Sequence, residues 1–344
     1  MVALSTIQSS NASALKTLFP YGPVGVFVGA TNGIGRAALL ALAKYATRPR
    51  LYFIGRSQSA ADEVLRQLKE INPDGQYEFV KADASLLSNV DRICLSIQAK
   101  ETKIDILFQS QGTLDFASET TEKLTLIMAL GYYSKMRFIA NLLPLLQRSS
   151  NPRVVVVLAG TKEGPVNPKD IPGKKVKIWQ ARGHLCSMMT LTLERFAQSA
   201  PDVSFVHSYP GFVRTSLDQS IRGVTGVIVR SITTITNMFV SRHWIPLEET
   251  GERHVFLATA PRFPSKERHT AMSGKEGGQE RTEVAVASDG QVGAGVYTVD
   301  ETCESGNASV QEVLCHLREN QTDRKIWEHL DGVFQRVTGH SPIR

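Results

Sequence analysis

Short, mostly apolar runs alternate along the chain with longer segments in which apolar residues recur at helical spacing. Short apolar and β-branched runs predict strands buried on both faces, as in a parallel sheet. They lie at residues 24–28, 51–55, 77–82, 104–108, 154–158, 203–209 and 293–299. Strand and helix alternate along this part of the chain, which predicts an α/β fold with a doubly wound parallel sheet of about seven strands.

Three segments with helical spacing bear on the site. Residues 122–147 predict one long helix that ends near Pro144, and residues 181–200 predict another. Within residues 216–245, the apolar positions between 221 and 239 fall on one face of a helix. This face predicts a helical lid over a bulky apolar ligand, with packing into the core or onto a membrane surface as alternatives.

Changes in composition divide the chain into four parts. Residues 1–22 form an N-terminal extension, and residues 23–260 form the predicted sheet domain with its lid at about 216–245. Residues 261–292 are polar and glycine-rich, and they predict a mobile insertion. Residues 293–344 supply the last strand and the C-terminal helices.

Composition and charge exclude several classes of protein. With 42% hydrophobic residues, the 344-residue chain can bury one large core. Its net charge is +6, but Lys and Arg are scattered without interleaved aromatic residues, so nucleic acid is not a predicted partner. No secretory signal begins the sequence, and the most apolar stretch, 221–240, carries Arg222 and Arg230, which argues against stable membrane insertion.

The four cysteines lie far apart and form no closely spaced pair; they are Cys94, Cys186, Cys303 and Cys315. This usage predicts reduced thiols in a cytoplasmic protein and no metal site.

Residues 24–36 carry the clearest chemical signal. A predicted strand ends at Val28, glycines follow at 29, 33 and 35, and a helical segment comes next. Gly29 permits a sharp turn, Gly33 leaves no side chain between backbone and phosphate, and Gly35 lets the helix pack close to the strand. Because a helix N-terminus binds phosphate, this order predicts a Rossmann-like dinucleotide site.

From this turn onward, residues 24–260 resemble the short-chain dehydrogenase/reductase (SDR) family. The resemblance rests on ATNGIGR at the glycine turn, Asp83 after the third strand, FQSQG at 108–112 and YPGFVRT at 209–215. It implies that Asp83 lies near the adenine and that the last motif flanks the nicotinamide. The cofactor-binding residues that it implies are Gly29, Thr31, Asn32, Gly33, Ile34, Gly35, Asp83, Gly112, Pro210, Gly211 and Thr215.

The residues after the second strand indicate which dinucleotide binds. An acid there usually holds the ribose 2′-hydroxyl of NAD, whereas an arginine favours the 2′-phosphate of NADP. This chain has Arg56 and Ser57, which can both donate to a phosphate, and no acid. The predicted cofactor is therefore NADP, with a plain surface role for Arg56 as the alternative.

The proton-transfer residues of the family are not found at the matching positions. The family uses a Tyr to protonate the developing alkoxide, together with a Lys four residues on, a Ser and an Asn. Ala159 or Gly160 stands where the Ser is expected, and Gly131 stands where the Asn is expected. Residues 177–197 supply neither the Tyr nor the Lys in register. The tetrad is therefore predicted to be absent.

Four other residues are the candidate catalytic groups. Tyr132 and Tyr133 lie beside the vacated Asn position, and Arg137 follows Tyr133 by one helical turn. Arg182 could steady an oxyanion, and His184 could exchange a proton near neutral pH. The alternative for the tyrosines and His184 is ordinary packing or capping.

Two further residues, Thr161 and Glu163, follow the fifth strand at its carboxyl end, where doubly wound sheets place ligands. Glu163 is therefore an additional candidate for acid–base work.

The stretch at 181–184, the end of the strand at 205–211 and the Trp-Glu-His at 327–329 resemble a divergent SDR branch common in fungal secondary metabolism. That resemblance implies an NADP-dependent oxidoreductase acting on a bulky apolar metabolite of polyketide or terpenoid type. A non-redox isomerase, cyclase or dehydratase stays open, as does a catalytically silent nucleotide-binding or regulatory protein. The oligomeric state also stays open; similar proteins often form homodimers through the fourth and fifth helices.

Overall fold

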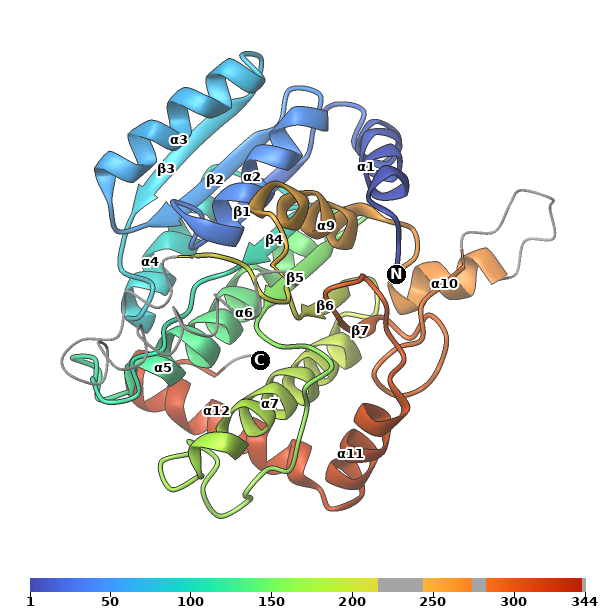
Figure 1. The fold of residues 1–344 in the computed structure, drawn as a ribbon. Helices are drawn as coiled ribbons and strands as arrows, with labels where there is room; N and C mark the ends of the chain where they lie inside the picture. The colour runs from blue at the N-terminus through green and yellow to red at the C-terminus, as the bar shows by residue number, and fades with distance from the viewer. Residues whose placement is uncertain (216–243, 274–282, 342–344) are drawn as a thin grey trace.

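The computed structural model describes residues 1–215, 244–273 and 283–341. Seven parallel strands form one sheet in the order β3-β2-β1-β4-β5-β6-β7 (Figure 1). The strands are β1 Val24–Val28, β2 Arg50–Gly55, β3 Gln76–Lys81, β4 Ile106–Gln109, β5 Arg153–Val157, β6 Ser204–Ser208 and β7 Val296–Val299. The predicted doubly wound sheet is confirmed, and each predicted strand lies within a few residues of an observed one.

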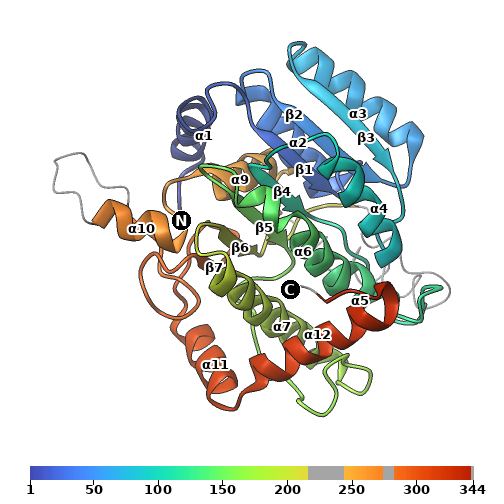
Figure 2. The same ribbon diagram turned by 180° about the vertical axis from the view of Figure 1, so that it is seen from behind.

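Helices cover both faces of the sheet, as Figures 1 and 2 show from opposite sides. One face carries α1 Leu4–Leu18, α2 Gly33–Tyr45, α3 Gln58–Ile71 and α9 Leu247–Thr259. The other face carries α4 Leu87–Gln98, α6 Ser134–Leu146, α7 Ile178–Ser199, α11 Ala308–Glu319 and α12 Thr322–Thr338. Alternate residues of a strand therefore enter different cores: Val154 and Val156 of β5 face one, and Val155 and Val157 the other.

The prediction of one long helix at 122–147 is wrong, because this segment forms two helices joined by a π-helical turn. A short helix, α5 Leu126–Met128, leads into a π-helical turn, Ala129–Tyr133, and α6 follows at once. Pro144 lies inside α6, two residues before its end, and does not terminate it. The π-turn widens the helix at Gly131, at the wall of the site described below.

The N-terminal extension contains a helix that the sequence did not reveal. Helix α1 packs against α9. The buried Asn11 side chain donates from Nδ2 to the backbone oxygen and to Oε2 of Glu252, both at 2.9 Å. Tyr45 donates its hydroxyl proton to Oε1 of the same carboxylate at 2.8 Å. Glu252 thus joins three helices on this face of the sheet.

The predicted insertion at 261–292 also contains ordered elements. Helix α10 spans Lys266–Ser273, and Phe263, Ala285 and Ala287 are buried. The mobility expected for this stretch stays a prediction. Most of the lid predicted at 216–245 lies outside the described residues. Among the helices that are described, none combines the length and the apolar character needed to cross a bilayer.

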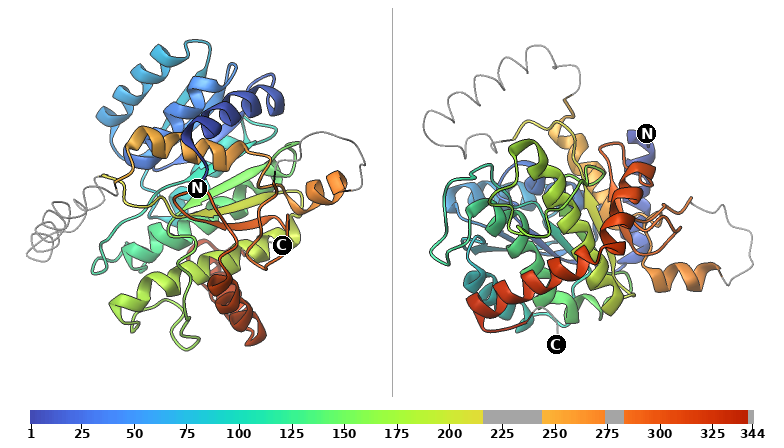
Figure 3. Two further views of the ribbon diagram at one scale, coloured as in Figure 1. Left: turned by 45° about the vertical axis from the view of Figure 1, so that its right-hand side comes forward. Right: turned by 90° about the horizontal axis from the view of Figure 1, so that it is seen from below.

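Helix α12 lies across α7 and α4, on the side of the sheet opposite α9 (Figures 2 and 3). The Trp327 ring packs edge-on against Phe196 of α7, with ring centroids 5.3 Å apart. Arg137 of α6 lies over the Phe334 ring at 5.0 Å. The C-terminal helices therefore complete this core.

Candidate functional site

A cleft of about 680 Å³ opens at the carboxyl edge of the sheet. Residues that follow β1, β2, β3, β4, β5 and β6 line it, together with the first turns of α2 and α7. The strand order reverses between β1 and β4. The segment that follows β1 and the segment that follows β4 therefore cross to opposite faces of the sheet, and the crevice forms between them. This is the place at which doubly wound sheets bind ligands.

The glycine turn forms one end of the cleft as predicted. Gly29 has φ +80°, and a Cβ there would lie 2.7 Å from the backbone nitrogen of Gln111. A Cβ on Gly35 would collide with Ser110 and lie 2.7 Å from the backbone oxygen of Gly29, which explains why helix and strand approach so closely. Asn32 caps α2 by accepting the Gly33 N–H at 2.7 Å. Of the predicted turn residues, the cleft is lined by Gly29, Thr31, Asn32, Gly33 and Ile34.

Two of the three residues predicted for the adenine end line the cleft. Arg56 lies there with an exposed side chain, and Asp83 lines the cleft from the loop after β3. Ser57 is not among the residues that line the cleft. Its Oγ caps α3 by accepting the Ala60 N–H at 3.2 Å. The assignment of Arg56 and Ser57 to a phosphate stays a prediction.

At the other end, Gly112, Pro210 and Thr215 line the cleft. Gly211 does not; it turns the chain at φ +74°, and a Cβ there would lie 2.9 Å from Glu301. A residue missed from the sequence is Gln111, which is buried and lines the cleft. Its Nε2 donates to Gln109 and Ser134, whereas its Oε1 has no partner among the described residues. That oxygen is available to accept a hydrogen bond from a bound molecule.

The part of the wall that contains Gly131 and Ala159 has small, apolar side chains. The π-turn contributes Gly131, Ala159 follows the end of β5 by two residues, and α7 presents Ala181 and Leu185 one helical turn apart. Within the described lining, the polar side chains contributed by α7 are Arg182 and Cys186. Arg182 is exposed, whereas the Cys186 thiol is buried.

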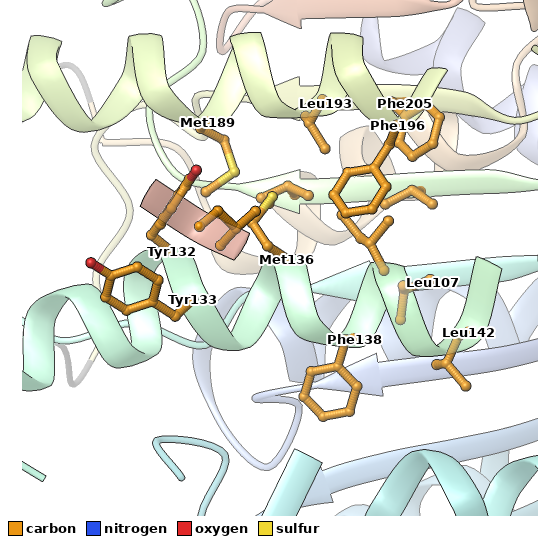
Figure 4. Close-up of a cluster of buried hydrophobic side chains, with 14 of the residues drawn as sticks. Leu107, Tyr132, Tyr133, Met136, Phe138, Leu142, Met189, Leu193, Phe196 and Phe205 are labelled. Carbon is orange, nitrogen blue, oxygen red and sulfur yellow. The ribbon is translucent and has the colours of Figure 1, made fainter. Parts of the chain in front are cut away.

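The structure does not bring the two candidate tyrosines to the cleft. Tyr132 is fully buried between the π-turn and α7, near Met136 and Met189, as Figure 4 shows. Its hydroxyl lies 2.7 Å from Oγ1 of Thr192. The Tyr133 hydroxyl lies 2.7 Å from Nε2 of His329 on α12. Burial raises the pKa of both phenols, so the geometry favours the packing alternative over an acid–base role.

His184 is also held away from the cleft. Its Nε2 donates to the backbone oxygen of Ile171 at 2.9 Å, and its Nδ1 accepts the Asn167 N–H at 3.3 Å. Both ring nitrogens thus bind the loop at 160–177, and the ring is 2% exposed. Neither nitrogen can reach a ligand in the cleft, so the structure supports a loop-anchoring role.

A doubly wound parallel sheet with a glycine turn at the head of its first crossover helix defines a Rossmann-like nucleotide-binding protein. The family model for short chain dehydrogenase matches residues 24–223. The chain belongs to the short-chain dehydrogenase/reductase family, and its class is that of an SDR-like oxidoreductase.

Two curated relatives come from fungi. Oxidoreductase AN1596 of Emericella nidulans is 34% identical over 346 residues, which cover 98% of this chain and 99% of that protein. Short-chain dehydrogenase/reductase SAT2 of Stachybotrys chartarum is 28% identical and covers 89% of this chain and 90% of its own length. Among solved structures, L-sorbose reductase from Gluconobacter frateurii in complex with NADPH and L-sorbose has a TM-score of 0.50 at 18% identity, covering 70% of this chain and 90% of its own. That likeness shows the fold alone.

Proposed function

We propose that this protein is an NADP-dependent oxidoreductase that acts on a bulky, apolar small molecule. The observation that carries the proposal is the continuity of the cleft, which runs from Arg56 past the glycine turn to an apolar half. A dinucleotide would fill the first part, and a substrate would meet it in the second.

The residues of the first part fit the cofactor. The N–H groups at the start of α2 face a turn whose glycines leave room for a pyrophosphate. Arg56 would bind the 2′-phosphate of the adenosine, and Asp83 would lie near the adenine. The free Oε1 of Gln111 would accept a hydrogen bond at the nicotinamide end. When bound, the cofactor supplies or takes up a hydride.

The second part of the cleft fits an apolar metabolite of polyketide or terpenoid type. Its apolar lining residues are Leu114, Phe116, Ile127, Leu130, Leu158 and Leu185. The Phe116 side chain is 50% exposed and would be covered by an apolar ligand. Fungal relatives named oxidoreductase support the redox part of the proposal.

Titration with NADPH and with NADH tests the proposal. Binding is followed by energy transfer from tryptophan to the bound nicotinamide. The Kd should be lower for NADPH than for NADH. If neither NADPH nor NADH binds, the redox function is excluded. Equal affinities would exclude the assignment of Arg56 to the 2′-phosphate.

A non-redox isomerase, cyclase or dehydratase on the same scaffold is the second candidate. The observation that favours it is the wall formed by Gly131, Ala159, Ala181 and Leu185, because these side chains carry no proton donor. Product formation without any change in nicotinamide absorbance would identify this case. A catalytically silent protein would bind nucleotide and turn over neither class of substrate.

We propose that the protein is cytoplasmic, and the four free cysteines support this proposal. A homodimer stays a prediction; helix α12 packs against α7 and α4 on one face of the sheet.

A further inference from the structure

A second cavity, of about 30 Å³, lies at the amino edge of the sheet, where β5 and β6 begin. The end of α9 and the first turn of α10 close it, and among the described residues its lining has no member in common with the cleft. In Figure 1, α10 lies at the right of the sheet, whereas α5, beside the cleft, lies at the left. The cavity is too small for a nucleotide but has room for more than one water molecule. It is therefore a separate site of the size of a small ligand.

The guanidinium group of Arg153 lies at this cavity. Arg153 is the first residue of β5, and it is 8% exposed. Its Nη1 donates to the backbone oxygen of Leu257 at 2.7 Å, and its Nη2 donates to that of Ala260 at 3.3 Å, so it caps the end of α9. Its Nε has no hydrogen-bond partner, and no carboxylate of the described residues forms an ion pair with it. A buried cation is usually neutralised by a carboxylate, so the charge of Arg153 is uncompensated.

A second guanidinium group, that of Arg268 in the first turn of α10, lines the same cavity. Its side chain is half-buried and makes no hydrogen bond or ion pair with a described residue. Burial lowers the pKa of both guanidinium groups, and the charge of Arg268 lowers the pKa of Arg153 further, so the two charges are close enough to repel each other. Nearby Arg262 differs, because it pairs with Glu283 and Glu304. These two carboxylates neutralise Arg262 and leave the cavity with two like charges.

Two hydroxyl groups add donors to the same wall. Oγ of Ser265 accepts the Arg268 N–H at 3.3 Å, and Oγ of Ser150 accepts from Nδ2 of Asn151 at 3.1 Å. Each hydroxyl accepts a bond without donating one to a described residue, so its proton is available to a ligand. Guanidinium and hydroxyl donors that line one cavity are the groups that bind an oxyanion.

Two acceptors in the lining narrow the choice of anion. Oδ1 of Asn151 is buried and has no partner among the described residues. Asp202 accepts from Nε2 of Gln147 at 3.2 Å through Oδ1, and its Oδ2 makes no hydrogen bond with a described residue. These oxygens would repel an anion that carries no proton, such as sulfate, whereas an anion with an O–H group can donate to them. Hydrogen phosphate has such a group, so the lining fits phosphate better than sulfate.

We propose that this cavity binds inorganic phosphate in the form of hydrogen phosphate. Arg268 and Ser265 would donate to its oxygens from α10, and the charge of Arg153 would attract it from β5. Its P–OH group would donate to the Asp202 carboxylate. A phosphate monoester has an alkyl group in place of that proton, so the same lining favours the free anion over an ester.

Bound phosphate would connect three segments that are far apart in sequence. It would contact the start of β5 at Arg153, the segment before β6 at Asp202 and the first turn of α10 at Arg268. Phosphate should therefore stabilise the packing of α10 against the sheet, because a ligand stabilises the state that binds it. The proposal goes beyond the oxidoreductase function proposed above and does not depend on it.

Hydrogen exchange followed by mass spectrometry tests the site on the full chain. Exchange at residues 257–273 is measured in phosphate and in sodium chloride of equal ionic strength. Phosphate at about 20 mM should slow this exchange roughly fivefold, which is the factor 1 + [L]/Kd for a Kd of about 5 mM. Phosphate that binds at the glycine turn of the cleft would slow exchange at residues 29–36 instead, so the two sites are recorded separately. Unchanged exchange at 257–273 in the wild-type protein would overturn the proposal.

Arg268→Met tests the guanidinium group on α10 with little risk to the fold, because this side chain is half-buried and bonds to no described residue. It should abolish the effect of phosphate at residues 257–273 and leave residues 29–36 as they are in the wild-type protein. Arg324→Met is the matched control, since it removes an equal charge from the exposed side of α12 and should leave the response to phosphate unchanged. If Arg268→Met responds to phosphate as strongly as the wild-type protein does, the proposal is wrong.

Sulfate and methyl phosphate test the role of the P–OH group. Both are dianions without a proton at pH 7.5, so each should slow exchange less than about half as much as phosphate does. Asp202→Asn replaces the repelling carboxylate with an amide that can donate, so sulfate should slow exchange in this variant as much as phosphate does. Equal effects of sulfate and phosphate on the wild-type protein would overturn the assignment of hydrogen phosphate. A stronger effect of methyl phosphate would overturn the inorganic ligand in favour of a phosphate ester.

Discussion

The hydroxyl group of Tyr133 lies 2.7 Å from Nε2 of His329, so the π-turn beside the cleft is tied to the C-terminal helix 196 residues away. The two rings lie 5.9 Å apart between centroids, and the tyrosine is 2% exposed. A side chain that the sequence suggested as an acid is therefore part of the packing that positions the cleft wall.

Replacing Tyr133 with Phe should reduce stability and leave cofactor binding unchanged. The change removes one partly buried hydrogen bond, which is worth about 1 kcal/mol, and keeps the ring. Urea unfolding measures the loss, and NADPH titration provides the second readout. Tyr132→Phe is the matched variant, because it breaks the bond to Thr192 in the same way. If either variant lost most of its turnover without losing stability, the replaced tyrosine would have a catalytic role after all.

Arg56→Ala should weaken NADPH binding roughly tenfold to a hundredfold and leave NADH binding unchanged. The expected range corresponds to loss of charge-assisted hydrogen bonds to one phosphate. Arg66→Ala is a suitable control, because it removes an equal charge from the outer side of α3, where Arg66 pairs with Glu63 and Glu70. Equal weakening for both nucleotides would place Arg56 elsewhere along the cofactor.

His184→Ala should loosen the loop at 160–177 while the cofactor still binds. The ring satisfies two backbone groups of that loop, so its removal should destabilise the protein by about 2–3 kcal/mol. Limited proteolysis should show new cleavage in this loop. A variant with unchanged protease resistance and abolished turnover would instead identify His184 as catalytic.

Acid should destabilise the protein through His254. Burial lowers the pKa of this histidine to about 4, while Nδ1 donates to the Thr250 backbone oxygen and Nε2 lies 3.2 Å from Ser208 Oγ. The unfolded chain binds a proton near pH 6.5, so it gains protons before the folded chain does, and stability falls as pH drops from about 6.5 to about 4. The loss attributable to this residue is on the order of 3 kcal/mol.

Urea unfolding of wild-type protein and of His254→Gln across this range isolates the effect. The variant should have lower stability at pH 7 and a shallower decline toward pH 4. Parallel curves for the two proteins would show that His254 titrates normally in the folded state.

The sheet and the glycine turn at one end of the cleft could be predicted because they depend on local pattern. Apolar β-branched runs such as Val154–Val157 leave few alternatives to a buried parallel strand, and the glycines at 29, 33 and 35 act through their own backbone. Arg56 and Asp83 were located by counting residues from those strands.

Which candidate catalytic side chains reach the cleft could not be predicted in this way, because their positions depend on partners distant in sequence. No residue near Tyr133 in sequence indicates that its hydroxyl will form a hydrogen bond with His329. Likewise, the residues around His184 do not indicate that both ring nitrogens will bind backbone groups of Ile171 and Asn167. The π-turn is a change in backbone hydrogen bonding that side-chain periodicity does not record.

The docking of Asn11 against Glu252 has a practical consequence for producing this protein. Asn11, Ala12 and Ser13 spell an acceptor sequence for N-linked glycans, yet the Asn11 amide is fully buried between two helices. A sugar attached during passage through the endoplasmic reticulum would leave no room for α1 against α9. Expression by secretion should therefore yield a misassembled N-terminal helix, and Asn11→Gln would avoid the glycan in such a host.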